Sequence, residues 1–150
     1  MKLSLEYCLN ESIDEVWKHL MKVETLIYIA SPLVRFEPIK SKSFPTLWNV
    51  GNYETSMYIF GLLPFGRHHI VIEFPTPAIP SQRILLDNGY GVIISKWQHT
   101  IILEKQGSST TLYKDEVIIQ ASVLTPAVWL FAWIFYRWRR LRWKKLIKAK

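Results

Sequence analysis

The feature that most restricts the fold of this chain is an apolar helix close to the C-terminus. Helical signals run over residues 126–148, and Pro126 is tolerated at the start because the first N–H of a helix has no intrahelical partner. Residues 127–136 are apolar on every side. Such a helix must be buried over most of its circumference. We therefore expect an antiparallel sheet to close over it and to leave an apolar pocket between them.

The unbroken apolar stretch of this helix covers about ten residues, well short of the roughly 20 that are needed to cross a bilayer. The first residues alternate polar and apolar side chains and lack the continuous apolar core of a signal peptide. The single cysteine, Cys8, can form no internal disulfide, and we expect it to be a small buried residue of the first strand. These features favour a cytoplasmic protein, and peripheral association with a membrane remains an alternative.

The formal net charge of +7 is concentrated at the end of the same helix. Eight cationic residues lie there with no acid among them, and without them the rest of the chain carries a formal charge of about −1. The basic character belongs to one tail, and no recognition motif accompanies it, so nucleic acid is the least favoured partner. The eight residues are Arg137, Arg139, Arg140, Arg142, Lys144, Lys145, Lys148 and Lys150.

The remaining elements indicate one α+β domain over residues 1–150. Residues 2–9 alternate apolar and polar side chains, which is the period of a half-buried strand. Ser12 and Glu15 have the spacing of a capping box and predict a helix over residues 13–21. A second short helix over residues 24–29 must end before Pro32. Strand signals follow in series with connections short enough to force antiparallel neighbours. These six strands are predicted over residues 34–39, 51–60, 66–74, 82–90, 94–103 and 110–120.

The last two predicted strands form a hairpin whose turn lies at residues 106–109. Pairing them about this turn places His99 opposite Asp115 on the face that points inward. An imidazole and a carboxylate on an apolar face need one another, because neither would be tolerated there alone. Such a pair can raise the pKa of the histidine and act in proton transfer. It can equally be a structural clasp, which we favour because buried polar groups are normally paired whatever their role.

Two adjacent histidines, His68 and His69, lie in the strand predicted over residues 66–74. Alternation places His68 with Ile70 and Ile72, so only one of the two rings can point inward. Adjacent histidines on a strand cannot chelate one ion from the same side, and no cysteine or second carboxylate stands at a useful spacing. We expect neither a metal ion nor a cofactor.

The order of elements resembles the helix-grip fold of the START, Bet v 1 and polyketide-cyclase superfamily, often called SRPBCC. Residues 11–17 look like that superfamily's entry into its first helix. Two strands are also similar to the W-x-H and T-x-x-x-D-x-V strands of bacterial members of unassigned activity. The residues concerned are Trp97 and His99, then Thr110 or Thr111, then Asp115 and Val117. The resemblance implies a curved sheet of about seven strands wrapped around the long helix, with a cavity for a hydrophobic small molecule such as a lipid, sterol, polyketide or aromatic compound.

Two hypotheses for function follow. The favoured one is binding, and by extension transport, of a hydrophobic small molecule or lipid in the cavity. The alternative is an enzyme similar to cyclases or dehydratases, with His99 as general acid or base, Asp115 orienting it and Tyr113 donating a hydrogen bond to a developing oxyanion. The sequence sets neither the ligand nor the oligomeric state. The residues expected to contact a ligand are Trp48, Tyr53, His68, Ile70, Ile72, Tyr90, Trp97, Ile101, Val117, Trp129 and Trp133.

The basic end of the final helix has two interpretations. Cations in the last turns complement the helix dipole and stabilise a solvated C-terminus, which is the interpretation we favour. Tryptophans interleaved with cations also suit an anionic membrane surface, where each cation contributes about 1 kcal/mol. The residues assigned to such a surface are Arg137, Trp138, Arg139, Arg140, Arg142, Trp143, Lys144 and Lys145.

Overall fold

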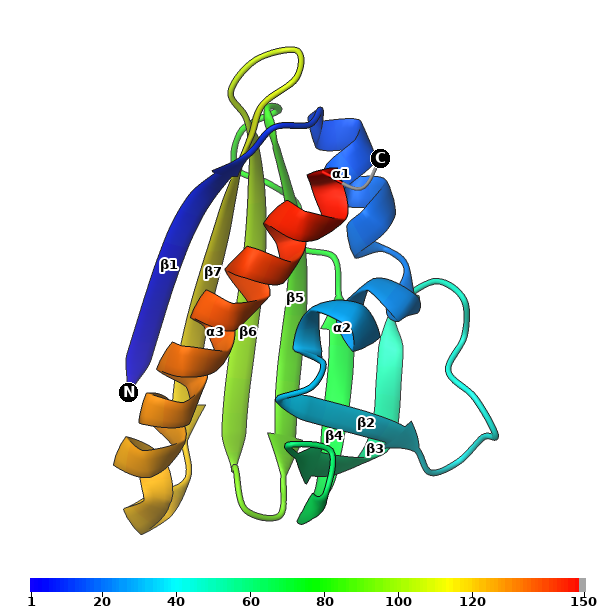
Figure 1. The fold of residues 1–150 in the computed structure, drawn as a ribbon, viewed down its shortest axis with the longest axis vertical. Coiled ribbons are helices and arrows are strands. Elements are labelled where there is room, and N and C mark those ends of the chain that lie inside the picture. Colours follow the sequence, from blue (N-terminus) through cyan, green and yellow to red (C-terminus); the bar gives the residue numbers. More distant parts are fainter. Residues whose placement is uncertain (149–150) are drawn as a thin grey trace.

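The computed structural model describes residues 1–148, so Lys150 of the basic tail lies outside the described part. Over this range the chain forms one seven-stranded antiparallel sheet in the order β1-β7-β6-β5-β4-β3-β2, covered by three α-helices (Figure 1). The elements are β1 (Lys2–Leu9), α1 (Ile13–Leu20), α2 (Val23–Ala30), β2 (Val34–Pro38), β3 (Gly51–Ile59), β4 (Leu63–Glu73), β5 (Gln82–Gly91), β6 (Lys96–Lys105), β7 (Thr111–Gln120), the 3-10 turn η1 (Ser122–Leu124) and α3 (Thr125–Lys148).

The sequence patterns predict these elements well. Each expected helix and strand is present, with bounds that differ by three residues at most. Ser12 is the N-cap of α1, and its Oγ accepts a hydrogen bond from the Glu15 N–H at 3.3 Å. The domain is therefore α+β, with two short helices between the first and second strands.

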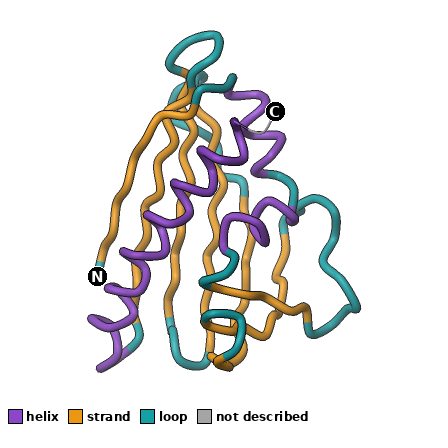
Figure 2. The backbone as a smooth tube through the Cα atoms, in the orientation of Figure 1, coloured by secondary structure: helices purple, strands orange, loops and turns teal. Residues whose placement is uncertain are grey.

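The long helix α3 lies diagonally across one face of the curved sheet, with α2 beside it (Figures 1 and 2). Two clusters of buried side chains fill much of the space between helices and strands. One gathers around Trp143 and Tyr113 at the C-terminal end of α3, and the other around Phe135 and Val117 nearer its N-terminal end. The sheet and α3 together therefore frame whatever space remains between these clusters.

The expectation that residues 127–136 are buried over most of their circumference does not hold for their outer face. Leu130 is 55 % exposed, Trp133 38 % and Ile134 50 %. The sheet keeps two separate edges, at β1 and at β2, and curves across one side of the helix without closing around it. Only the stripe that faces the sheet and α2 is buried. Its residues are Val128, Ala132, Phe135, Tyr136, Arg139, Trp143 and Ile147.

The hairpin of β6 and β7 has a different register from the predicted one. His99 pairs with Val117 instead of Asp115, a shift of two residues. The loop is centred one residue later than expected, because the Gln106 N–H donates to the Thr110 carbonyl oxygen at 3.0 Å and closes the turn there. A shift of two residues keeps each side chain on its predicted face. His99 consequently still reaches Asp115, along the diagonal between the strands.

Cys8 is exposed, against the expectation that it is buried. The inward positions of β1 are taken by Leu3, Tyr7 and Leu9, and strand alternation turns Cys8 outward. The alternating pattern of residues 2–9 already contained this result, since Cys8 directly follows the inward Tyr7.

Candidate functional site

The sheet, α2 and the N-terminal half of α3 enclose a cavity of about 270 Å³. This volume is close to the lower end of the range for small-molecule sites, roughly 300–1,000 Å³. Each strand from β2 to β6 contributes to its wall, and most of the lining is aliphatic or aromatic. Apolar residues of the wall include Met57, Phe65, Trp97, Val128, Phe131 and Phe135. The curved sheet and the long helix therefore leave an apolar pocket between them.

Four polar side chains interrupt this apolar lining: His68, Asp87, His99 and Arg139. They come from β4, β5, β6 and α3, so four separate elements bring them together. Asp87, His99 and Arg139 also line a smaller hollow of about 50 Å³ beside α1 and Trp48. Asp87, His99 and Arg139 therefore lie at the inner end of the main cavity, between the cavity and the smaller hollow.

The predicted contact between His99 and Asp115 is present, with His99 Nε2 2.6 Å from Asp115 Oδ1 and both side chains buried. The predicted rise in the pKa of His99 is not found. Burial lowers this pKa below its ordinary value of 6.5, and the hydrogen bond with Asp115 opposes the change only in part. The lowered pKa favours a neutral ring near pH 7, and such a ring donates its Nε2 proton when Asp115 is a carboxylate. His99 lines the cavity, whereas Asp115 lies behind it.

Asp87 faces His99 directly across the pair of strands β5 and β6. Its Oδ1 accepts a hydrogen bond from the Val71 N–H at 2.9 Å. Burial raises the pKa of Asp87 from 3.8 to about 7, while the bond from Val71 and the charge of Arg139 lower it by less. The carboxyl group is thus divided between its neutral and ionised forms near neutral pH.

His68 lies on the inner face of β4, against two glycines of β5. A methyl group on Gly89 would lie 3.0 Å from His68 Nε2 and 2.9 Å from the His69 carbonyl oxygen. A methyl group on Gly91 would lie 2.6 Å from the Arg67 carbonyl oxygen. Glycine is needed at both positions for this close approach. Burial lowers the pKa of His68 to about 4, so its ring is also neutral near pH 7.

Trp97 and Tyr136 connect the sheet to α3 at the border of the cavity. Trp97 Nε1 donates a hydrogen bond to Tyr136 Oη at 3.1 Å, and the two ring centroids are 6.1 Å apart. The Tyr136 ring also meets the His99 ring edge to face at 4.9 Å. These contacts hold α3 at a fixed distance from β6.

The predicted ligand-contacting residues fall into three groups. Those in the main cavity are His68, Ile70 and Trp97. Those in the smaller hollow are Trp48, Ile72 and Ile101. Those that line neither space are Tyr53, Tyr90, Val117, Trp129 and Trp133.

The third group has other surroundings. Val117 is closed inside the core, and Tyr53 Oη hydrogen-bonds to the backbone of the loop before β3. Trp129 Nε1 donates to the Lys2 carbonyl oxygen at 3.0 Å. Trp133 lies on the outer side of α3 and is 38 % exposed. These positions are corrections to the predicted site: aromatic character alone does not show which side of an element a residue occupies, and an inward side chain such as Val117 can be enclosed by the core instead of facing the cavity.

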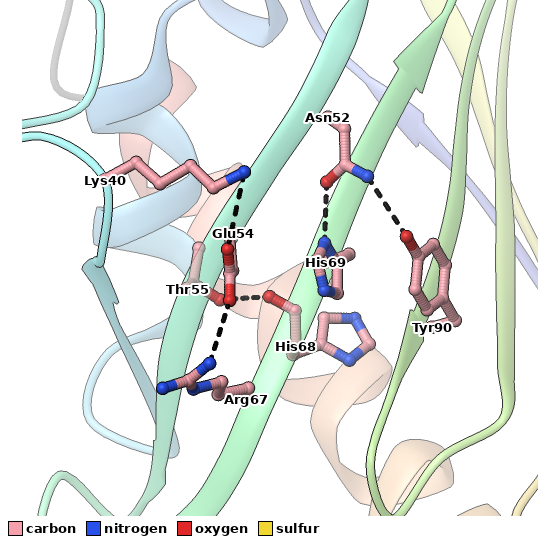
Figure 3. A network of polar contacts seen from close by, with 8 residues as sticks. All are labelled: Lys40, Asn52, Glu54, Thr55, Arg67, His68, His69 and Tyr90. Carbon is pink, nitrogen blue, oxygen red and sulfur yellow. Dashed lines mark hydrogen bonds and ion pairs between the residues drawn. The ribbon is translucent and has the colours of Figure 1, made fainter.

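Tyr90 lies with His69 on the outer face of the sheet (Figure 3). Their rings stack with centroids 4.5 Å apart, and the Asn52 side chain hydrogen-bonds to both, at 2.8 Å to His69 and 3.1 Å to Tyr90. His68 is buried on the opposite face. The prediction that only one of the two adjacent histidines points inward is confirmed.

Tyr113, expected to donate a hydrogen bond to an oxyanion, does not line the cavity. It is fully buried and stacks on Tyr7, with ring centroids 5.0 Å apart. Its ring centroid also lies 5.3 Å from that of Trp143. Its hydroxyl group is therefore out of reach of a molecule in the cavity, and the expected role does not fit this position.

The basic end of α3 is not the fully exposed surface that its composition indicates. Arg139 is 3 % exposed and Trp143 is 0 % exposed, because helical periodicity turns both toward the core. Trp138 and Arg142 donate hydrogen bonds to backbone carbonyls of α2 and its C-cap. The residues of the predicted set that are exposed or half-buried and make no such bond to α2 are Arg137, Arg140, Lys144 and Lys145.

Two polar residues of the cavity, Asp87 and Arg139, were not predicted to line it: Asp87 was assigned to no site, and Arg139 was assigned to a membrane surface. For Asp87 the signal was strand alternation, which places it on the same face as the buried residues Leu85 and Gly89. For Arg139 the signal was its spacing of four residues from both Phe135 and Trp143. Its place in a run of cations concealed this position on the apolar stripe.

No protein-family model matches the sequence, and a search of curated proteins finds no match. Solved structures do match. A START superfamily protein from Mycobacterium smegmatis is 12 % identical, with a TM-score of 0.64 over 99 % of this chain and 97 % of the other. ZhuI aromatase/cyclase from Streptomyces sp. R1128 is 7 % identical, with a TM-score of 0.63 over 99 % and 93 %. A conserved protein from Geobacillus kaustophilus is 17 % identical, with a TM-score of 0.61 over 99 % and 96 %. The chain therefore has the helix-grip fold of START-like and Bet v 1-like proteins.

Among residues 1–148, no group of three or more histidine, cysteine, aspartate or glutamate side chains is placed to hold a metal ion. Within the same range, none of the helices combines the length and the apolar character needed to span a bilayer.

Proposed function

We propose that the chain binds a hydrophobic small molecule or lipid in the cavity between the sheet and α3. The observation that carries this proposal is an apolar cavity of about 270 Å³ inside an otherwise packed domain. Protein interiors are close-packed, and an unfilled apolar space forgoes the dispersion contacts that a ligand would supply. Leu124 lines the cavity and is 49 % exposed, so the space reaches the surface near the start of α3. The START superfamily protein and the aromatase/cyclase that share the fold support a ligand-binding use of it.

Titration with a neutral apolar fluorophore, N-phenyl-1-naphthylamine, tests this proposal. We expect saturable binding with one site per chain. Val128 is buried and lines the cavity, so Val128→Phe places additional atoms in the vacant space and should weaken binding at least tenfold. Leu141→Phe enlarges an exposed residue of the same helix and should leave binding unchanged. The absence of saturable binding, or equal effects of the two variants, would contradict the proposal.

We extend the proposal to ligand exchange at an anionic membrane surface. The outer face of α3 combines exposed apolar side chains with exposed cations, and residues 125–148 include no acid. A helix of this kind lies in the interface of an anionic bilayer, with apolar residues inserted and cations near the head groups. The exposed residues concerned are Leu130, Trp133, Ile134, Leu141, Lys144 and Lys145.

Flotation with vesicles of phosphatidylcholine, with and without phosphatidylglycerol, tests this extension. We expect the protein to bind only the anionic vesicles and to be released by salt, because exposed charges are screened. The double variant Trp133→Gln and Ile134→Gln should lose most of this binding. Val50→Gln changes a residue that is 70 % exposed in a distant loop and is the control. Equal binding to both kinds of vesicle, or equal binding by the two variants, would contradict the extension.

His99 favours a second candidate function, an enzyme of the cyclase or dehydratase type. Its neutral ring borders the cavity and donates its Nε2 proton to Asp115, which leaves Nδ1 as a proton acceptor. Cyclisation with dehydration changes the mass of a bound molecule by one water. Native mass spectrometry of wild-type and His99→Gln protein from the same host would therefore distinguish the two functions. A ligand of the variant that is heavier by one water than the ligand of the wild type supports catalysis. Ligands of equal mass in the two proteins support binding alone.

A further inference from the structure

Arg139 is a feature of the cavity that apolar binding does not explain. Its side chain is 3 % exposed, lies on the buried stripe of α3 and lines both the main cavity and the smaller hollow. Within residues 1–148 it forms no hydrogen bond or ion pair, and its Nε is buried without a partner. A guanidinium group carries a full charge and five N–H donors. Burying it without acceptors is unfavourable, so a missing partner is the simplest explanation of its position.

The nearby protein groups do not supply that partner. Asp115 Oδ1 is bonded to His99, Asp115 Oδ2 is buried with no hydrogen-bond partner, and Asp87 Oδ1 is bonded to the Val71 N–H. The Arg139 guanidinium lies 5.0 Å from the ring centroid of Tyr136, a contact that attracts the charge but accepts no strong hydrogen bond. Asp115 stabilises the charge of Arg139 through space, and the pKa of Arg139 is raised despite its burial. The donors of Arg139 remain available to a molecule inside the cavity.

The surroundings of Arg139 restrict which molecule this is. The apolar wall requires an apolar body, and the planar fork of a guanidinium matches a carboxylate through two parallel hydrogen bonds. Asp87 and Asp115 lie close by, so a doubly charged head group such as a phosphate monoester would be repelled. Asp87 can take up a proton when one negative charge enters, because its pKa is about 7. A single carboxylate is therefore the head group that this site accommodates best.

We infer that the ligand of this cavity is an apolar molecule with one carboxylate, of the fatty-acid class, whose head group is held by Arg139. This inference rests on the proposed function and specifies its ligand. The apolar body then fills the space lined by Trp97, Phe131 and Phe135. The carboxylate lies at the inner end of the cavity, where Asp87, His99 and Arg139 meet.

Isothermal titration calorimetry with dodecanoate, 1-dodecanol and dodecyl phosphate tests the inference. We expect the wild-type chain to bind dodecanoate at least tenfold more tightly than 1-dodecanol, and dodecyl phosphate more weakly than dodecanoate. Arg139→Met keeps an apolar side chain of similar length and removes the fork. It should weaken dodecanoate binding at least tenfold and leave 1-dodecanol binding within about threefold. Arg140→Met, on the adjacent residue outside the cavity lining, is the matched control and should change neither affinity.

Arg139→Lys provides a second variant, because lysine keeps the charge but not the fork. It should fall between wild type and Arg139→Met in its preference for dodecanoate. Circular dichroism reports whether each variant is folded. Arg139→Met removes the charge that stabilises the buried Asp115 carboxylate, so Arg139→Lys, which keeps that charge, should be the more stable of the two. An equal loss of acid and alcohol binding in Arg139→Met would overturn the inference, as would tighter binding of dodecyl phosphate. A wild-type protein that binds 1-dodecanol without preferring the acid would overturn it and leave the proposed function standing. Binding of none of the three would overturn both.

Discussion

The two halves of α3 rest on the same sheet but have different surroundings. In the C-terminal half, Trp143 is fully buried and lies against Tyr113, which stacks on Tyr7, so helix and strands are in close contact. In the N-terminal half, Phe131 and Phe135 border a cavity of about 270 Å³. The comparison indicates that the two halves of one helix have different roles. Close packing at one end stabilises the domain, and the other end can stay open for a ligand.

The largest expected effect separates these two ends. Trp143→Ala removes a fully buried ring from the packed end and should lower the free energy of unfolding by about 3–5 kcal/mol. Phe131→Ala removes a half-buried ring that already borders the cavity and should cost about 1–2 kcal/mol. Urea unfolding followed by circular dichroism measures both values. Equal losses, or a larger loss for Phe131→Ala, would contradict the division between the two ends.

The second prediction concerns the pH dependence of the open end. The pKa of Asp87 is raised from 3.8 to about 7, so the folded chain holds a proton that the unfolded chain has released between these values. The contribution of Asp87 to the free energy of unfolding therefore decreases as pH rises from about 4 to 7. Above about pH 7 it no longer changes with pH. Relative to Asp87→Asn, the wild type should lose about 4 kcal/mol across this window, at about 1.4 kcal/mol per pKa unit.

The comparison with Asp87→Asn cancels the pH-dependent contributions of the other groups that face Asp87, since both proteins keep those groups. His68 on β4 acts with the opposite sign, because its lowered pKa makes the fold more stable as pH rises from about 4 to 6.5. His99 on β6, Asp115 on β7 and Arg139 on α3 are also common to both. Urea unfolding at several pH values measures the difference. A difference that does not change between pH 4 and 7 would show that Asp87 is ionised in the folded chain.

The smallest expected effect comes from the glycines beside His68. Gly89→Ala would place a methyl group 2.9 Å from the His69 carbonyl oxygen and 3.0 Å from His68 Nε2. The backbone must shift to relieve this contact, at a cost of about 1–3 kcal/mol. Gly107→Ala is the matched control, because a methyl group there would meet nothing within 4 Å. It should change stability by no more than about 0.5 kcal/mol. Thermal unfolding compares the two, and equal midpoints would contradict the close approach of β4 and β5.

The packed end was easier to predict from the sequence than the open end. Alternation in residues 2–9, the serine cap before α1 and the short connections are local signals, and they identified each element and the faces of β6 and β7. A shift of two residues in that hairpin left the faces unchanged, so the contact between His99 and Asp115 was predicted despite the different register. Local patterns therefore predicted the sheet.

The open end depends on how the elements are arranged in space, which local patterns do not specify. Residues 127–136 contain no polar residue to mark the outer side of α3, so the exposure of Leu130 and Ile134 could not be predicted. Arg139 lies in a run of cations, and only its spacing from Phe135 and Trp143 places it inside. The cavity also depends on empty volume, which no single residue encodes.

The central claim is that the space between β4, β6 and the N-terminal half of α3 receives an apolar molecule. The most direct test is a crystal structure of the protein grown with 1-dodecanol, which requires no charged head group. The account predicts continuous density for the alkyl chain inside the cavity, in contact with Trp97, Phe131 and Phe135. Density found only on the protein surface, with these side chains closing the space, would contradict the account.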